Sequence, residues 1–170
     1  EYDAGGIMSR IVDGEGNEST YRYGPCGRLL EAVDANRMAS RIRWGTEPGQ
    51  LLSFENARGE VAEFEYDADG RLSAATLFDG TTQRYAYNGA GYCTTVTDTV
   101  GGITSFERDA YGRILKKETP DGQVATFEYD ALGNLVAASN GTCEIRCEYD
   151  SLGRMVREHG PEALLEFEYD

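Results

Sequence analysis

The feature that most constrains this sequence is a glycine that returns about every 21 residues. Each of these glycines follows a Tyr, Trp or Arg by four or five positions, and the spacing between them is 20 to 22 residues. Self-similarity at such a period is typical of repeat proteins, in which each unit buries its apolar surface against its neighbours. The sequence therefore predicts eight tandem units in one array over residues 1–170. The phase is the same at both ends, which predicts an excerpt of a longer repeat region; the glycines are Gly6, Gly27, Gly49, Gly70, Gly91, Gly112, Gly133 and Gly153.

Residues 60–80 show the unit most clearly. Asp67 and Gly70 stand at the first and fourth positions of a four-residue segment, which is typical of a type I turn closed by a glycine with positive φ. In the preceding segment 62–66, Phe64 and Tyr66 alternate with glutamates. This alternation predicts a β-strand with one apolar face.

A second turn is indicated in each unit by pairs such as Asp13-Gly14 and Asp79-Gly80, which favour tight hairpin turns. Strand, turn, strand and turn in every unit give about sixteen short antiparallel strands, and no segment has helical periodicity. A sheet of that many strands would be roughly 75 Å wide, and open twisted sheets of such a width curl or close. The predicted fold class is all-β: tandem antiparallel β-hairpins that form a curved or spiral sheet.

Three segments carry a resemblance to a known family. YDADGRL (66–72), YDALGNL (129–135) and YDSLGRM (149–155) resemble the Rhs or YD-repeat family, whose units read Tyr-Asp, two variable residues and Gly-Arg-Leu. The resemblance covers all 170 residues, although Trp44 and Arg108 replace the motif Tyr and Asn88 replaces the motif Asp. Tyr92 also stands where Arg is usual.

The resemblance implies a structural role. In this family, which includes bacterial polymorphic toxins, insecticidal toxin cocoons and teneurins, the repeats form a hollow β-shell that in the toxins encloses a C-terminal effector. The implied partners are the neighbouring repeats and an effector domain of the same polypeptide, and the implied location is secreted or cell-surface, in a bacterial parent. The residues expected to serve the repeat structure, besides the eight glycines, are Tyr2, Tyr23, Arg28, Trp44, Tyr66, Asp67, Arg71, Tyr87, Asp109, Arg113, Tyr129, Asp130, Tyr149, Asp150 and Arg154.

Catalytic, metal and cofactor sites are not indicated. His159 is the only histidine, no Cys or His spacing fits zinc, and the chain lacks the Asp-Pro element at which the family's toxins cleave themselves. The net charge of −14 argues against a nucleic-acid partner, and no apolar run is long enough to span a membrane. Cys93 and Cys147 replace apolar residues at periodic positions and are interpreted as buried free thiols.

Two other interpretations remain open at the level of sequence. One is an extracellular adhesive or carbohydrate-binding array, in which aromatic pairs would be exposed for stacking. The other is a β-propeller, with two units in each blade. The arginines that follow the motif glycines (Arg28, Arg71, Arg113 and Arg154) are expected to pair with acidic groups of the neighbouring unit.

Overall fold

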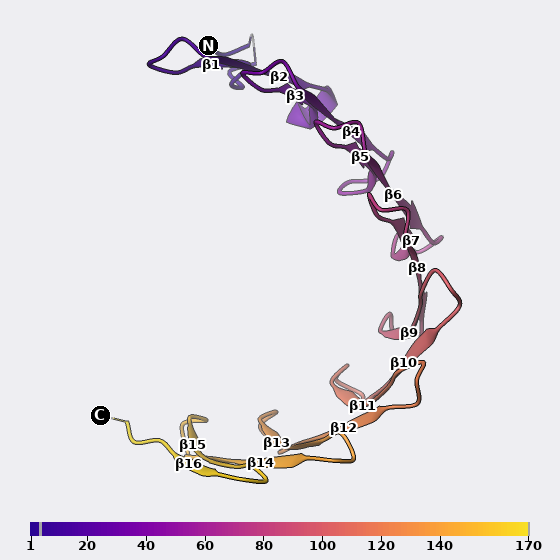
Figure 1. The fold of residues 1–170 in the computed structure, drawn as a ribbon, viewed down its shortest axis with the longest axis vertical. Coiled ribbons are helices and arrows are strands. Elements are labelled where there is room, and N and C mark those ends of the chain that lie inside the picture. The colour runs from indigo at the N-terminus through magenta and orange to yellow at the C-terminus, as the bar shows by residue number, and fades with distance from the viewer. Residues whose placement is uncertain (4, 170) are drawn as a thin grey trace. The chain divides into compact units, whose positions relative to one another are not determined.

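A computed structural model describes residues 1–3 and 5–169, and the described chain is built almost entirely of β-strands (Figure 1). It divides into two compact units, Glu1–Arg84 and Tyr85–Asp170, which are described separately below. The first unit contains β1 (Arg10–Val12), β2 (Glu18–Tyr23), β3 (Leu29–Val33), β4 (Ala39–Trp44), β5 (Leu51–Glu55), β6 (Val61–Tyr66), β7 (Leu72–Thr76) and the start of β8 (Thr82–Tyr87). The second contains the end of β8 and then β9 (Cys93–Thr97), β10 (Ile103–Arg108), β11 (Ile114–Glu118), β12 (Val124–Tyr129), β13 (Leu135–Ser139), β14 (Glu144–Tyr149), β15 (Met155–His159) and β16 (Leu164–Glu166).

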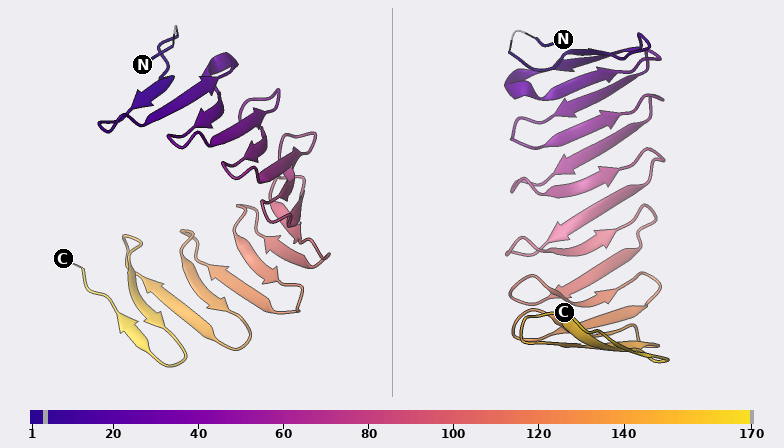
Figure 2. Two further views of the ribbon diagram at one scale, coloured as in Figure 1. Left: turned by 45° about the horizontal axis from the view of Figure 1, so that its top comes forward. Right: turned by 90° about the vertical axis from the view of Figure 1, so that its left-hand side faces the viewer.

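The strand order follows the sequence from β1 to β16 without a crossover. Every strand pair whose register is defined is antiparallel, as the meander in Figure 2 shows. This confirms the predicted all-β fold of tandem hairpins and the predicted number of strands. In the first unit the pairing continues from β1 to β8, so its strands do not separate into four-stranded blades. The propeller interpretation is therefore wrong.

The motif turn has the geometry that the sequence predicts. The Gly70 N–H donates to the Asp67 carbonyl at 3.0 Å, and the Asp67 N–H donates to the Arg71 carbonyl at 2.8 Å. Gly70 has a φ of +78°, in the left-handed region where a side chain is disfavoured. All eight motif glycines have positive φ, and six of them close this same turn: Gly6, Gly70, Gly91, Gly112, Gly133 and Gly153.

The second turn differs in detail from the sequence prediction. The Asp13-Gly14 pair begins a longer loop that is closed by Gly16, whose N–H donates to the Asp13 carbonyl at 3.1 Å. The glycine of Asp79-Gly80, in contrast, is itself the closing residue and has a φ of +79°. An Asp-Gly pair alone does not fix the turn, because what these loops share is a left-handed glycine at the fourth position.

One short helical turn was not predicted. Pro25–Gly27 form a 3-10 turn in place of the second repeat's motif turn. Pro25 fixes its own φ near the helical value, and Cys26 lies in the left-handed region with a φ of +61°.

The sheet is a single layer with two unlike faces. On one face, Phe64 is opposite Ala75 and Phe54 is opposite Ala62; on the other, Glu31 is opposite Arg41. The buried apolar residues that the structure describes are small, namely Ala62, Ala74, Ala75, Ala137 and Cys147, and among the described residues no large side chain is fully buried. The core is therefore thin. Short side chains within the sheet are covered by the longer side chains of adjacent strands, and the periodic aromatic residues are mostly half-buried.

Candidate functional site

The arginine that follows the motif glycine binds an acidic group of its own turn. Arg71 Nε lies 2.8 Å from Asp67 Oδ2, and Arg71 Nη2 lies 2.7 Å from Asp69 Oδ2. The same pairing within the turn is found for Arg113 with Asp109 at 2.6 Å and for Arg154 with Asp150 at 2.8 Å. The expectation that these arginines pair with acids of the next unit is therefore wrong. The turn folds the Asp back toward the Arg four positions later, which brings its carboxylate within ion-pair distance of the guanidinium.

Two of these arginines, Arg113 and Arg154, also reach the next unit, through its aromatic ring. The guanidinium carbon of Arg113 lies 4.7 Å from the ring centre of Tyr129, and that of Arg154 lies 4.6 Å from the ring centre of Tyr169. Arg28 is placed similarly over Trp44 at 5.9 Å. These are cation–π distances, so each of these arginines joins its own turn to the aromatic residue of the following unit.

The motif Asp is held as a carboxylate. Oδ1 of Asp67 accepts the N–H groups of Asp69 and Arg71 at 3.0 and 2.9 Å, and these donors, with the Arg71 side chain, lower the pKa of Asp67. The pKa of Asp150 is lowered in the same way by Arg154. At Asp130 the side-chain amide of Asn134 replaces the arginine, donating at 2.9 Å, and lowers the Asp130 pKa. These carboxylates therefore serve to stabilise the turns.

The motif aromatic residue donates a hydrogen bond to the backbone through the polar group of its ring. Tyr66 Oη donates to the Leu51 carbonyl at 3.1 Å, Tyr149 Oη donates to Leu135 at 2.9 Å, and Trp44 Nε1 donates to Leu29 at 2.7 Å. Each acceptor lies one unit back in the sequence. Sequence reasoning missed this role, although these side chains share a terminal donor as well as a ring.

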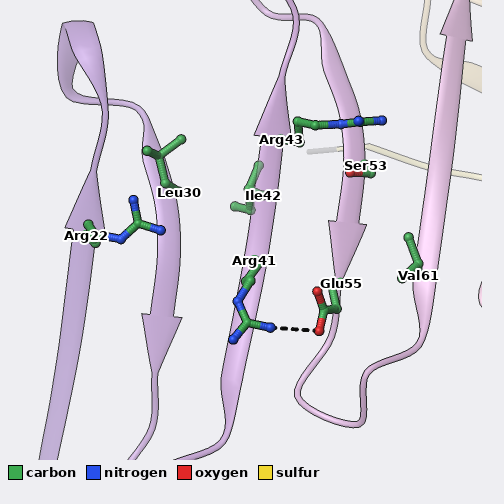
Figure 3. A pocket seen from close by; sticks show the side chains of 8 residues that line it. All are labelled: Arg22, Leu30, Arg41, Ile42, Arg43, Ser53, Glu55 and Val61. Atoms are coloured by element: carbon green, nitrogen blue, oxygen red, sulfur yellow. Dashed lines mark hydrogen bonds and ion pairs between the residues drawn. The ribbon is translucent and has the colours of Figure 1, made fainter.

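Charges on the opposite face pair across neighbouring strands. Glu31 lies 3.3 Å from Arg22 and 3.0 Å from Arg41, and Arg41 Nη1 lies 2.9 Å from Glu55. Figure 3 shows the Arg41–Glu55 contact in a shallow depression lined by β2 to β6. The Arg41 hydrogen bond, followed by that of Arg22, lowers the pKa of Glu31. Because Arg22 and Arg41 already bind carboxylates, the depression does not offer them as free cations for a phosphate.

Groups that could perform chemistry are scattered. His159 is exposed and lies 3.1 Å from Glu148. Cys147 is buried and Cys93 half-buried, and burial raises the pKa of the Cys147 thiol, which disfavours the reactive thiolate. Within residues 1–3 and 5–169, no three His, Cys, Asp or Glu side chains gather where they could hold a metal ion. In the same part of the chain, no helix is long and apolar enough to cross a membrane.

The fold and these contacts define a tandem array of β-hairpins whose recurring residues serve turns and the boundaries between units. Comparison with known proteins agrees. The model of the RHS Repeat family matches residues 49–82 and 108–142. The probable deoxyribonuclease RhsB of Dickeya dadantii is 31% identical over the whole chain, and the double-stranded DNA deaminase toxin A of Burkholderia cenocepacia is 27% identical over 94% of it.

The chain spans only 12% of the length of each of these two relatives. A crystal structure of TcdB2-TccC3-TEV has the same fold, with a TM-score of 0.76 and 17% identity over all of this chain and 11% of that one. This chain belongs to the Rhs or YD-repeat family.

Proposed function

We propose that this chain is a non-catalytic wall segment of an Rhs-type β-shell that encloses a toxin or effector domain of the same polypeptide. The observation that carries the proposal is the single-layer sheet, in which strands pair with their sequence neighbours and the two faces differ in polarity. A sheet of this kind grows by adding units and can separate two compartments, whereas a compact core would close on itself. The parent would be a secreted or cell-surface bacterial protein.

The relatives' names describe activities that we place outside this segment. One is named a deoxyribonuclease and another a deaminase toxin, yet this chain matches only about an eighth of each. The part that these relatives share with this chain is the repeat array, which fits a common β-shell that encloses different effector domains.

A carbohydrate-binding array is the alternative that the same test must separate. Stacking on sugars needs exposed aromatic faces, and such faces are not the rule at the motif position. Tyr66 and Tyr149 are half-buried, with their hydroxyl groups bonded to the backbone. This favours the wall over the adhesive array.

The experiment is a three-dimensional structure of the longest natural polypeptide that contains these repeats, combined with limited proteolysis. We expect the repeats to line a closed wall around a second domain, and we expect that domain to resist protease in the intact polypeptide. The matched control is the enclosed domain expressed without the array, which should be cut readily. An open array, or equal cleavage with and without it, would overturn encapsulation. Binding to a glycan panel would then support the adhesive alternative.

A further inference from the structure

The backbone ladder between successive units does not extend to the first residue of the strand that follows the motif turn. Between β5 and β6 the last pair toward the motif turn is Ser53 with Glu63, although β5 starts at Leu51. Between β13 and β14 the last pair is Ala137 with Arg146, although β13 starts at Leu135. Pairing within a unit continues further, through a bulge, as far as Tyr66 with Leu72. The first residue of each of these strands therefore lies beyond the ladder that joins it to the following unit.

A side chain from the following unit fills this place. Tyr66 Oη donates to the Leu51 carbonyl at 3.1 Å and also accepts the Leu51 N–H at 3.2 Å, so one hydroxyl serves both backbone groups of that residue. The hydroxyl of Tyr149 reaches the carbonyl of Leu135 in the equivalent place.

Two other residue types perform the same contact. Trp44 Nε1 donates to the carbonyl of Leu29 at 2.7 Å, and Arg108 Nε donates to the carbonyl of Cys93 at 3.0 Å. Both acceptors are the first residue of their strand, fifteen positions back. Arg108 has no ring, yet it meets the same backbone acceptor.

At the motif position, a terminal hydrogen-bond donor is more constant in the sequence than an aromatic ring. All nine residues at the motif position have a terminal donor, and none is Phe: Tyr2, Tyr23, Trp44, Tyr66, Tyr87, Arg108, Tyr129, Tyr149 and Tyr169. Two positions earlier on the same strands Phe is common, at Phe64, Phe106, Phe127 and Phe167. If ring packing were the requirement, Phe would be as suitable in the first set as in the second.

We infer that the motif position is a hydrogen-bonding position that closes the boundary between two units, and that it requires a long side chain with a terminal donor and not an aromatic ring. Arg108 is then an equivalent of Tyr and not a degenerate copy. An unpaired backbone carbonyl that is partly withdrawn from water is destabilising, which explains why the donor is kept. The inference concerns the array itself and holds whatever the array encloses.

The test uses amide hydrogen exchange in the 170-residue chain. Tyr66→Phe keeps the ring and removes the hydroxyl that accepts the Leu51 N–H and donates to the Leu51 carbonyl, so exchange at the Leu51 amide should accelerate roughly 2- to 10-fold, the range expected for one lost hydrogen bond. Tyr66→Trp restores a donor for the Leu51 carbonyl but no acceptor for the Leu51 N–H, so it should recover the urea midpoint that Tyr66→Phe loses while exchange at the Leu51 amide stays fast. The control Tyr21→Phe removes a hydroxyl two positions before a motif Tyr, away from the first residue of any strand in the ladder described above, and should change exchange at the Leu51 amide less than twofold.

Arg108 provides a second measurement that does not depend on Tyr66 variants folding. Arg108→Tyr should keep the urea midpoint of the parent, and Arg108→Met, which keeps a long stem without a donor, should lower it. A requirement for a ring predicts a different order relative to the parent, in which Tyr raises the midpoint and Met leaves it unchanged. That order, or unchanged Leu51 exchange in a folded Tyr66→Phe chain, would overturn the inference.

Discussion

Gly112 and Gly70 occupy the same turn position but differ in what surrounds them, which separates backbone strain from steric conflict. Gly70 has a φ of +78°, and a Cβ there would meet only Gln50 Nε2, at 4.0 Å. Gly112 has a φ of +86°, but a Cβ there would lie against the ring of Tyr92, 2.6 Å from Cζ and 2.9 Å from Cδ1. Tyr92 stands where half of the repeats have Arg and no other has Tyr, so this conflict is specific to one boundary.

The expected costs follow from these two environments. Gly70→Ala should destabilise the chain by about 1–2 kcal/mol, the cost of a left-handed residue with a side chain. Gly112→Ala should add about 1–3 kcal/mol, because the Tyr92 ring must move, as in an overpacked core. Replacing the ring first, in Tyr92→Ala, should return the cost of Gly112→Ala to that of Gly70→Ala.

Urea unfolding followed by circular dichroism measures all four variants, with an unchanged m-value as the condition for comparing midpoints. The difference between the Gly112→Ala costs with and without Tyr92 is the coupling energy of the pair. Equal costs for Gly70→Ala and Gly112→Ala would refute the steric part of the reasoning. A Gly112→Ala cost that persists in the Tyr92→Ala background would refute the assignment to Tyr92.

Three further outcomes are expected. Leu132 and Leu152 lie at turn tips with 79% and 76% of their surface exposed, so changing both to Ser should leave the urea midpoint unchanged and raise solubility; a loss of stability would show that they are covered. Asp67 and Asp150 have pKa values below those of the unfolded chain, so their stabilisation is present above about pH 4 and is lost as the pH falls through the lower folded values. An acid titration should show this loss, and Asp67→Asn should weaken it. Arg41→Gln removes an exposed cation between two glutamates, so the loss should be small and should vanish in 1 M salt; a salt-independent loss would indicate packing by its stem.

The sequence predicted those features that depend on local order. The period, the alternation of Phe64 and Tyr66 and the turn at Asp67 and Gly70 each involve neighbours in the chain, and the structure agrees with all three. The partner of Arg71 was predicted wrongly, because the turn brings Asp67 closer than any acid of the next unit. Which backbone group Tyr66 reaches depends on where the ladder between β5 and β6 stops. The residue types in these strands do not predict that register.

The difference between contacts within a turn and contacts between units explains how the array tolerates units that depart from the consensus sequence. In a single-layer sheet each unit contacts only its neighbours, so stability is close to a sum over units and their boundaries. A substitution such as Arg108 is therefore judged at one boundary, where it donates to Cys93 of the preceding unit and to Gly112 of its own turn. Asn134 likewise replaces the arginine within its own turn, because its side-chain amide donates to Asp130 as an arginine does in other units. What recurs from unit to unit is a set of backbone acceptors and turn conformations, and each residue that satisfies them can replace the consensus residue without disturbing the rest of the array.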